Sequence, residues 1–132
     1  MIVMVSGGFD PVHVGHIHLF NAAADYGDVV VALNSDDWLM RKKGYVFMPH
    51  MERTVILTAL EKVTIVTPVT DFDDTVCEAL RRVRPDIFCN GGDRFHANKR
   101  EAEVCFELSI KQVFGVGGTK TQSSSELVAR VR

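Results

Sequence analysis

Apolar residues occur along this chain in short runs rich in valine and isoleucine, separated by longer segments in which apolar positions recur every three or four residues. Short continuous runs are typical of parallel strands covered on both faces, and the longer pattern is typical of amphipathic helices. The predicted strands are residues 2–6, 29–33, 63–67, 86–89 and 112–116. The predicted helices are residues 15–26, 51–60, 74–83, 99–109 and 123–131.

Strands and helices alternate along the whole chain, which predicts an α/β fold. We expect a single Rossmann-like domain over residues 1–132, with a five-stranded, mainly parallel sheet flanked by helices. Ligands of such sheets bind at the carboxyl ends of the strands. Those ends are the polar, glycine-rich residues 6–8, 34–36, 90–93 and 117–121.

Composition limits the classes of partner. A chain of 132 residues with a formal net charge of -2 lacks the basic surplus of most nucleic-acid-binding proteins. No apolar stretch reaches the length of a membrane span. The three cysteines, at wide spacing and without a C-x-x-C pair, indicate reduced, mostly buried thiols in a cytoplasmic protein.

The turn between the first strand and the first helix reads G-G-F-D-P-V-H-V-G-H. Gly7 and Gly8 allow the backbone to approach a ligand closely, and the helix that begins near Gly15 offers unpaired N–H groups. His13 and His16 are three residues apart and fall on one side of the helix start. Two imidazoles beside these amides suit a phosphate chain and its leaving pyrophosphate.

Neighbouring polar residues are less specific. A lone histidine is usually an ordinary surface residue, and we place His18 at the rim of the site; the pair at a glycine-lined turn favours catalysis instead. Asp10 could orient a histidine, contact the acceptor or help to hold Mg²⁺, and the sequence does not choose among these roles.

The H-x-G-H signature after G-x-F-D resembles the cytidylyltransferase-like nucleotidyltransferase superfamily. That superfamily includes glycerol-3-phosphate cytidylyltransferase and the heptose-phosphate adenylyltransferase domain. The resemblance extends over nearly the whole chain, because four later segments match in the same order. These are V-A-L-N-S-D at residues 31–36, the helix with Glu52-Arg53, the turn Asn90-Gly91-Gly92-Asp93, and Ser123-Ser124-Ser125.

The resemblance implies roles for individual residues. The catalytic residues it implies are His13, His16 and Lys43. The implied nucleotide-binding residues are Gly7, Gly8, Phe9, Gly15, Lys42, Gly91, Asp93, Thr121, Ser123, Ser124 and Ser125. The implied acceptor-binding residues are Asp10, Arg53 and Arg94.

Three of these assignments have plain alternatives. Lys42 and Lys43 could be part of a solvated basic face, but the family places lysines here on a mobile loop over the triphosphate. Arg53 could be an exposed helix arginine; we expect it to point away from the buried face and to bind the acceptor's phosphate. Arg94 stands where the family commonly has an aromatic residue, which leaves base stacking by this guanidinium open.

The resulting expectation is transfer of CMP or AMP from an Mg²⁺-bound NTP to a phosphorylated small alcohol or sugar, with release of pyrophosphate. The length of the chain resembles that of glycerol-3-phosphate cytidylyltransferase and favours CTP as donor. Its central segments resemble the heptose-phosphate adenylyltransferases and favour ATP. Relatives suggest a homodimer. A nucleotide-binding module without catalysis is the main alternative. A dinucleotide-dependent oxidoreductase is disfavoured because no G-x-G-x-x-G follows the first strand of this chain. A tRNA synthetase fragment is disfavoured because this chain is too short and too acidic to bind tRNA.

Overall fold

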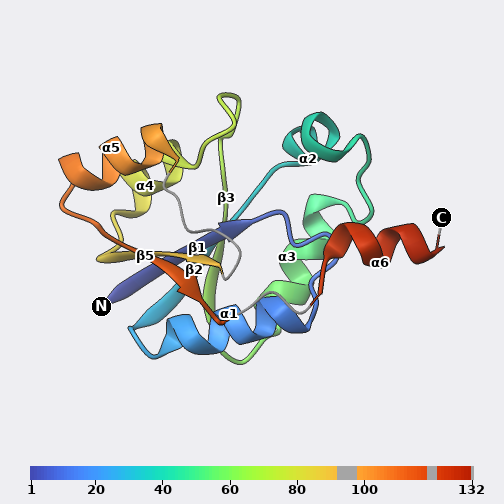
Figure 1. Cartoon of the computed structure of the whole chain (residues 1–132), viewed down its shortest axis with the longest axis horizontal. Helices are drawn as coiled ribbons and strands as arrows, with labels where there is room; N and C mark the ends of the chain where they lie inside the picture. Colours follow the sequence, from blue (N-terminus) through green and yellow to red (C-terminus); the bar gives the residue numbers. More distant parts are fainter. Residues whose placement is uncertain (92–97, 119–121, 132) are drawn as a thin grey trace.

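A computed structural model describes residues 1–91, 98–118 and 122–131. The predicted fold class is confirmed, since five strands form one sheet with helices on both faces (Figure 1). The strands are β1 (Ile2–Gly7), β2 (Asp28–Leu33), β3 (Val63–Pro68), β4 (Ile87–Gly91) and β5 (Lys111–Val116). The helices are α1 (Val14–Ala24), α2 (Asp36–Lys43), α3 (His50–Thr58), α4 (Cys77–Val83), α5 (Lys99–Glu107) and α6 (Ser124–Val131).

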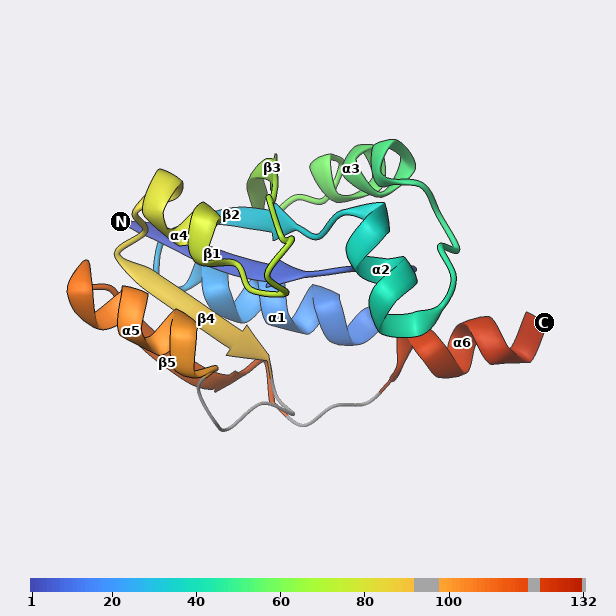
Figure 2. The ribbon, with the colours of Figure 1, turned by 90° about the horizontal axis from the view of Figure 1, so that it is seen from above.

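The strand order is β3-β2-β1-β4-β5, and each neighbouring pair is parallel. The chain therefore builds one half of the sheet outward from β1, then returns to the other side of β1 for β4. Strand order switches between β1 and β4, and a crevice opens beyond the carboxyl ends of strands at such a point. The helices α2 and α6 lie at this end of the sheet (Figure 2).

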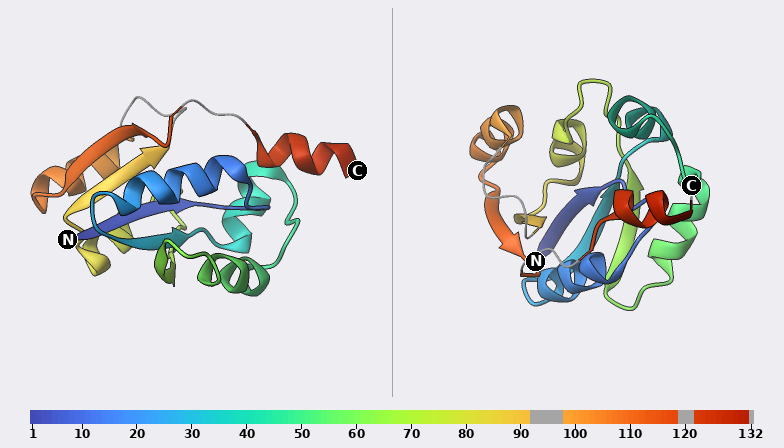
Figure 3. Two further views of the ribbon diagram at one scale, coloured as in Figure 1. Left: turned by 90° about the horizontal axis from the view of Figure 1, so that it is seen from below. Right: turned by 45° about the vertical axis from the view of Figure 1, so that its right-hand side comes forward.

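Two hydrophobic clusters cover the two faces of the sheet. One joins β1 and β2 to Phe20 of α1 and Leu57 of α3. The other joins Met4 and Phe88 of the sheet to Leu80 of α4 and Val104 of α5. The view from below shows α1 and α3 on the first face (Figure 3).

The prediction of a mobile loop around Lys42 and Lys43 is wrong, because both residues belong to α2. The Ser35 hydroxyl accepts the Trp38 N–H at 3.0 Å and begins this helix. Gly44, with φ of 79°, ends it. Only Leu39 of this helix is buried, so it has almost no apolar periodicity that would predict it.

The fourth helix also begins later than predicted. Asp74 has φ of 62°, and the Asp73 carboxylate accepts the Thr75 N–H at 3.0 Å, so these residues form a turn. The helix itself starts at Cys77. The prediction that this helix begins at residue 74 is therefore wrong.

Two expectations from composition can be compared with the structure. Cys89 and Cys105 are buried and Cys77 is half-buried, and all three are free thiols, as predicted. None of the helices in the described residues is both long and apolar enough to span a membrane.

Candidate active site

Phe9 shapes the turn that follows β1. Its backbone has φ of 49°, and its buried ring meets the ring of Phe20 at 5.4 Å and that of His16 edge-on at 4.7 Å. A Cβ atom at Gly7 would lie only 3.0 Å from the Phe9 ring. Gly7 therefore makes room for Phe9, which in turn supports the imidazole of His16.

His13 and His16 lie together at the start of α1, as predicted. Nδ1 of His13 accepts the Gly15 N–H at 3.1 Å, and Nδ1 of His16 accepts the His13 N–H at 3.1 Å. The rings stack with centroids 3.8 Å apart and planes 25° apart. Because each Nδ1 is an acceptor, the proton of each neutral ring is on Nε2. Each ring can thus present an N–H donor to an anion.

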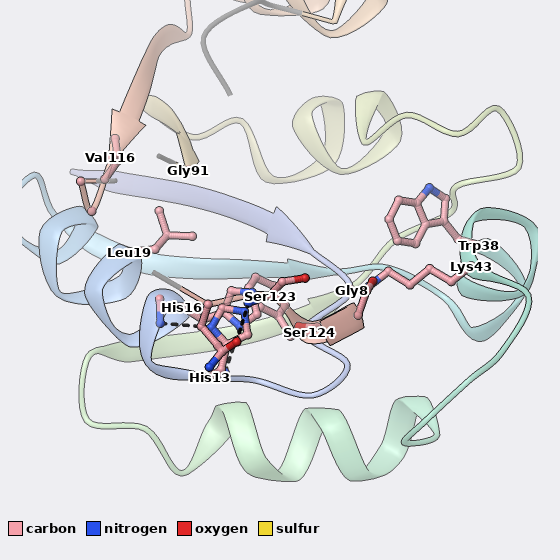
Figure 4. Close-up of a pocket in the computed structure, with 16 residues that line it drawn as sticks. Gly8, His13, His16, Leu19, Trp38, Lys43, Gly91, Val116, Ser123 and Ser124 are labelled. Carbon is pink, nitrogen blue, oxygen red and sulfur yellow. Dashed lines mark hydrogen bonds between the residues drawn. The ribbon is translucent and has the colours of Figure 1, made fainter. Parts of the chain in front are cut away.

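The histidine pair opens onto a cavity of about 300 Å³ (Figure 4). This volume is at the lower end for small-molecule sites. The predicted site residues that line it are Gly8, Phe9, His13, Gly15, His16, Lys43, Gly91, Ser123, Ser124 and Ser125. They come from α1, α2, β4 and α6 and from the turns that precede α1 and α6. The structure therefore brings most of the predicted nucleotide site together at the switch in strand order.

The start of α6 closes one side of this cavity. The Ser124 hydroxyl donates to the Pro11 carbonyl at 2.8 Å, which ties α6 to the histidine turn. The Ser123 hydroxyl accepts the Glu126 N–H at 3.4 Å and so caps the start of α6. The first N–H groups of a helix bind anions well, so α6 adds to the donors of α1.

The two lysines at the end of α2 serve different cavities. Lys43 lines the histidine cavity, and in Figure 4 its side chain extends toward Gly8. Lys42 lines a second cavity of about 340 Å³, and its Nζ lies 5.9 Å from the centroid of the Trp38 ring. Trp38 lines both cavities.

The second cavity has a mixed lining of polar and apolar residues. Besides Trp38 and Lys42 it is lined by Ser6, Gly7, Asn34, Asp74, Val76, Asn98 and Glu101. Carboxylates and side-chain amides are hydrogen-bond partners for hydroxyl groups, and an aromatic ring offers a flat apolar face. Gly7 lines this cavity and not the histidine cavity, which differs from its predicted place.

Asp10 is fully buried and has a different role from the three that the sequence left open. Its two carboxylate oxygens accept the backbone N–H groups of Phe47 and Met48, each at 2.6 Å. It lines neither cavity. The prediction of acceptor binding is corrected here, because the carboxylate holds the loop after α2.

Arg53 also departs from its prediction. Its side chain is 0% exposed, although an exposed guanidinium was expected. The guanidinium donates to the carbonyls of Met48, Gly8 and Asn34 at 2.8–2.9 Å and forms an ion pair with Asp36 at 2.6 Å. The prediction of acceptor binding is corrected, because the guanidinium faces into the protein.

Three predicted residues, Asp93, Arg94 and Thr121, lie outside the described residues. The sequence reasoning also missed lining residues of the histidine cavity. These are Leu19, Trp38, Val116 and Gln122, with Gly117 and Gly118 placed only as a strand end. Trp38 had a usable signal, because a single tryptophan after a strand end is a natural platform for a ring.

The titratable groups near the sheet argue against thiol chemistry. Burial raises the pKa of the Cys89 thiol from 9.0 to about 11, and burial likewise raises the pKa of Cys105 to about 11. Both are protonated at neutral pH, and a protonated thiol is a poor nucleophile. Neither thiol lines the histidine cavity, so neither is placed to act on a ligand there.

The fit to a metal ion is limited. Within residues 1–91, 98–118 and 122–131, no three His, Cys, Asp or Glu side chains are grouped to hold an ion. The described lining of the histidine cavity includes no carboxylate. This lining is arranged for an anion, and a cation would have to enter with that anion.

Comparison with known proteins agrees with this arrangement. The model of the cytidylyltransferase-like family matches residues 4–115, from β1 into β5. The chain belongs to the cytidylyltransferase-like family. This match covers the histidine turn, α2 and the buried pair Asp10 and Arg53.

Relatives of this cytidylyltransferase-like domain include the bifunctional protein HldE of Sulfurimonas denitrificans, 34% identical over 96% of this chain. HldE of Gluconobacter oxydans is 41% identical over 96% of the chain. The chain spans about a quarter of the length of these curated relatives. A lipopolysaccharide core biosynthesis protein from Thermoplasma volcanium has the same fold, with a TM-score of 0.71 and 26% identity over 86% of this chain and 94% of that one.

Proposed function

We propose that this domain transfers a nucleoside monophosphate from an NTP to a phosphorylated sugar and releases pyrophosphate. The stacked pair of His13 and His16 carries this proposal, because it places two N–H donors beside the helix start where a phosphate chain binds. Membership of the cytidylyltransferase-like family supports the same chemistry.

The reaction is an in-line displacement at the α-phosphorus of the NTP. An oxygen of the acceptor's phosphate forms a bond to this phosphorus while the bond to the bridging oxygen of the β-phosphate breaks. Pyrophosphate leaves with the electron pair of that bond. Mg²⁺ enters as part of the Mg²⁺–NTP substrate, held by phosphate oxygens and water, which needs few protein ligands.

The chain's own residues position and stabilise this charge. His13 and His16 donate to the oxygens that gain charge as the bond to pyrophosphate breaks. Lys43 and the N–H groups at the start of α6 line the same cavity and hold the β- and γ-phosphates. Ser123 and Ser124 line the cavity at the α6 end.

The second cavity supplies a place for the acceptor. Asp74 binds Arg41 through Oδ1, and its other carboxylate oxygen can accept a hydrogen bond from a sugar hydroxyl. Lys42 provides a positive charge for the acceptor's phosphate. Trp38 borders both cavities, so an acceptor bound in the second cavity would lie next to the cavity that holds the α-phosphate.

The donor is proposed to be ATP, although the chain's length alone favoured CTP. Identities of 34% and 41% to HldE proteins, and the resemblance of the central segments to heptose-phosphate adenylyltransferases, support this choice. The lipopolysaccharide core biosynthesis protein of the same fold supports a sugar phosphate as acceptor.

A matrix of four NTPs against sugar and glycerol phosphates tests this function, with pyrophosphate release as the readout and Mg²⁺ in every well. We expect turnover with ATP and a sugar phosphate. Turnover with CTP and glycerol 3-phosphate would contradict both substrate choices while keeping the reaction. Nucleotide binding measured by thermal shift without pyrophosphate release in any well would identify a binding module without catalysis.

A further inference from the structure

Arg53 has the largest fully buried side chain of the described residues, yet it lines neither cavity. A buried guanidinium is costly unless its donors are paired, and here Nε and both terminal nitrogens are bonded to three separate parts of the chain. These are the histidine turn through the Gly8 carbonyl, the start of α2 through Asn34 and Asp36, and the loop after α2 through Met48. Arg53 therefore connects elements that each contribute to the site.

Asp10 makes the complementary connection. It belongs to the histidine turn, and its carboxylate accepts the N–H groups of Phe47 and Met48 in the loop after α2. Met48 is thus held from both sides, with its N–H bound to Asp10 and its carbonyl bound to Arg53. The two buried charges fix this loop to the turn that carries His13.

The consequence falls on Lys43. This lysine is in the last turn of α2, and α2 is anchored before its start at Asn34, in its first turn at Asp36 and beyond its end at Met48. A Cβ added to Gly8 would lie 2.9 Å from Leu39 Cδ2, so the histidine turn also packs directly on this helix. The position of the Lys43 backbone relative to His13 is therefore set by this buried network.

We infer that Arg53 is a positioning residue for nucleotidyl transfer, which sets Lys43 of α2 opposite the histidine pair through its contacts with Gly8, Asp36 and Met48. This inference rests on the proposed function. Arg53 does not touch the substrates. It acts through the placement of a lysine whose charge is useful only at the correct distance from the phosphates.

Asp36 gives a mild way to disturb this network, and the chain supplies a matched control. Asp36 and Asp37 both lie in the first turn of α2, so Asp36→Ala and Asp37→Ala remove the same charge from the same helix end. Only Asp36 is bonded to Arg53. We expect Asp36→Ala to lower kcat/KM about tenfold, and Asp37→Ala to change it less than about twofold.

A double-mutant cycle with Lys43→Ala separates positioning from general destabilisation. If Arg53 acts through Lys43, then Asp36→Ala will cost little in a protein that already lacks this lysine. We expect its effect to fall from about tenfold to less than about threefold in that background. Independent, multiplying effects of the two changes would overturn the inference, as would equal effects of Asp36→Ala and Asp37→Ala.

Arg53→Lys tests the network directly, because it keeps the charge and loses the planar fork that reaches several acceptors. We expect a larger loss of kcat than Asp36→Ala causes. Should this variant fail to fold, the Asp36 and Asp37 pair still decides the question.

Hydrogen exchange tests the same inference without any turnover. We expect faster exchange of the Gly44 and Met48 amides in Asp36→Ala than in Asp37→Ala, because α2 and its loop are less firmly held. Equal exchange in the two variants would overturn the positioning role. Absence of turnover and of ATP binding in the wild-type protein would instead overturn the proposed function, and the exchange result would still decide the role of Arg53.

Discussion

The backbone N–H of His13 donates to Nδ1 of His16 at 3.1 Å, and the two imidazole rings stack 3.8 Å apart. The same residues thus cap α1 and face the cavity. Capping fixes the tautomer and the direction of each ring, so Nε2 of each ring is presented as a donor. The hydrogen bonds that cap α1 therefore also orient the two imidazole rings of the candidate active site.

Replacement of His16 tests the catalytic role of this pair. We expect His16→Ala to reduce turnover by at least about 100-fold, because a preorganised donor to the transition state is lost. The cap on the His13 N–H is lost too, so the free energy of unfolding should fall by about 1 kcal/mol. His18→Ala is the control, because His18 is exposed on the same helix and lines neither cavity. Wild-type pyrophosphate release by His16→Ala would remove the pair from the mechanism.

The two lysines of α2 should give separable defects. We expect Lys43→Ala to weaken NTP binding by about tenfold or more, since one phosphate contact is lost. Lys42→Ala should instead raise the KM for the acceptor and leave NTP affinity within about twofold, because Lys42 lines the second cavity. Calorimetric titration of NTP and steady-state kinetics measure the two quantities. Lys62→Ala, an exposed lysine outside both cavities, is the control, and identical defects in Lys42 and Lys43 variants would contradict the assignment.

Gly15 is expected to matter for the position of His13. A Cβ atom at this residue would lie 3.0 Å from Cε1 and 3.2 Å from Nδ1 of His13, so Gly15→Ala must push the ring aside. Turnover should fall by about tenfold or more. Thermal stability should not fall in parallel, because alanine favours a helix by up to about 1 kcal/mol over glycine. Asn21→Ala, exposed on the same helix, should leave turnover unchanged; unaltered activity of Gly15→Ala would show that the ring can adjust freely.

Thiol reactivity provides a test of the core and of its pH dependence. Burial raises the pKa of Cys89 and Cys105 to about 11, two units above the ordinary value of 9.0, so the thiolate fraction at pH 8 falls about 100-fold. Iodoacetamide should therefore label half-buried Cys77 first in the native protein, and all three thiols in urea, as measured by mass spectrometry. Equally rapid labelling of native Cys89 would contradict the burial described here.

The same shifts have a consequence for stability with a definite sign. A thiol whose pKa is higher in the folded than in the unfolded state makes its full contribution to stability below pH 9, where both states keep the proton. Between about pH 9 and pH 11 the unfolded chain loses the proton and the folded chain keeps it. Stability should therefore decline as the pH rises through this range, and denaturant titrations at pH 8 and pH 10 measure the decline.

The sequence by itself predicted the five strands of the sheet and the histidine pair of the site, whereas the order of the strands came from the structure. Short apolar runs that end at glycines, such as residues 2–6, indicate buried strands. The glycine-flanked histidines in the next turn indicate two hydrogen-bond donors at the start of a helix. Both signals are local, because strand pattern and capping depend on residues within a few positions of one another. The exposed helix α2 gave a weaker signal, since it buries only Leu39.

Tertiary structure decided which charges face ligands and which hold the fold. Nothing in the sequence distinguishes Arg53 from an exposed helix arginine. Its burial is favourable because the fold brings together the carbonyls of Gly8, Asn34 and Met48 from distant segments. Lys42 and Lys43 are adjacent in the chain, yet the rotation of about 100° per residue in a helix sends them to different cavities. Such assignments depend on what lies opposite each side chain in space, which spacing along the chain does not specify.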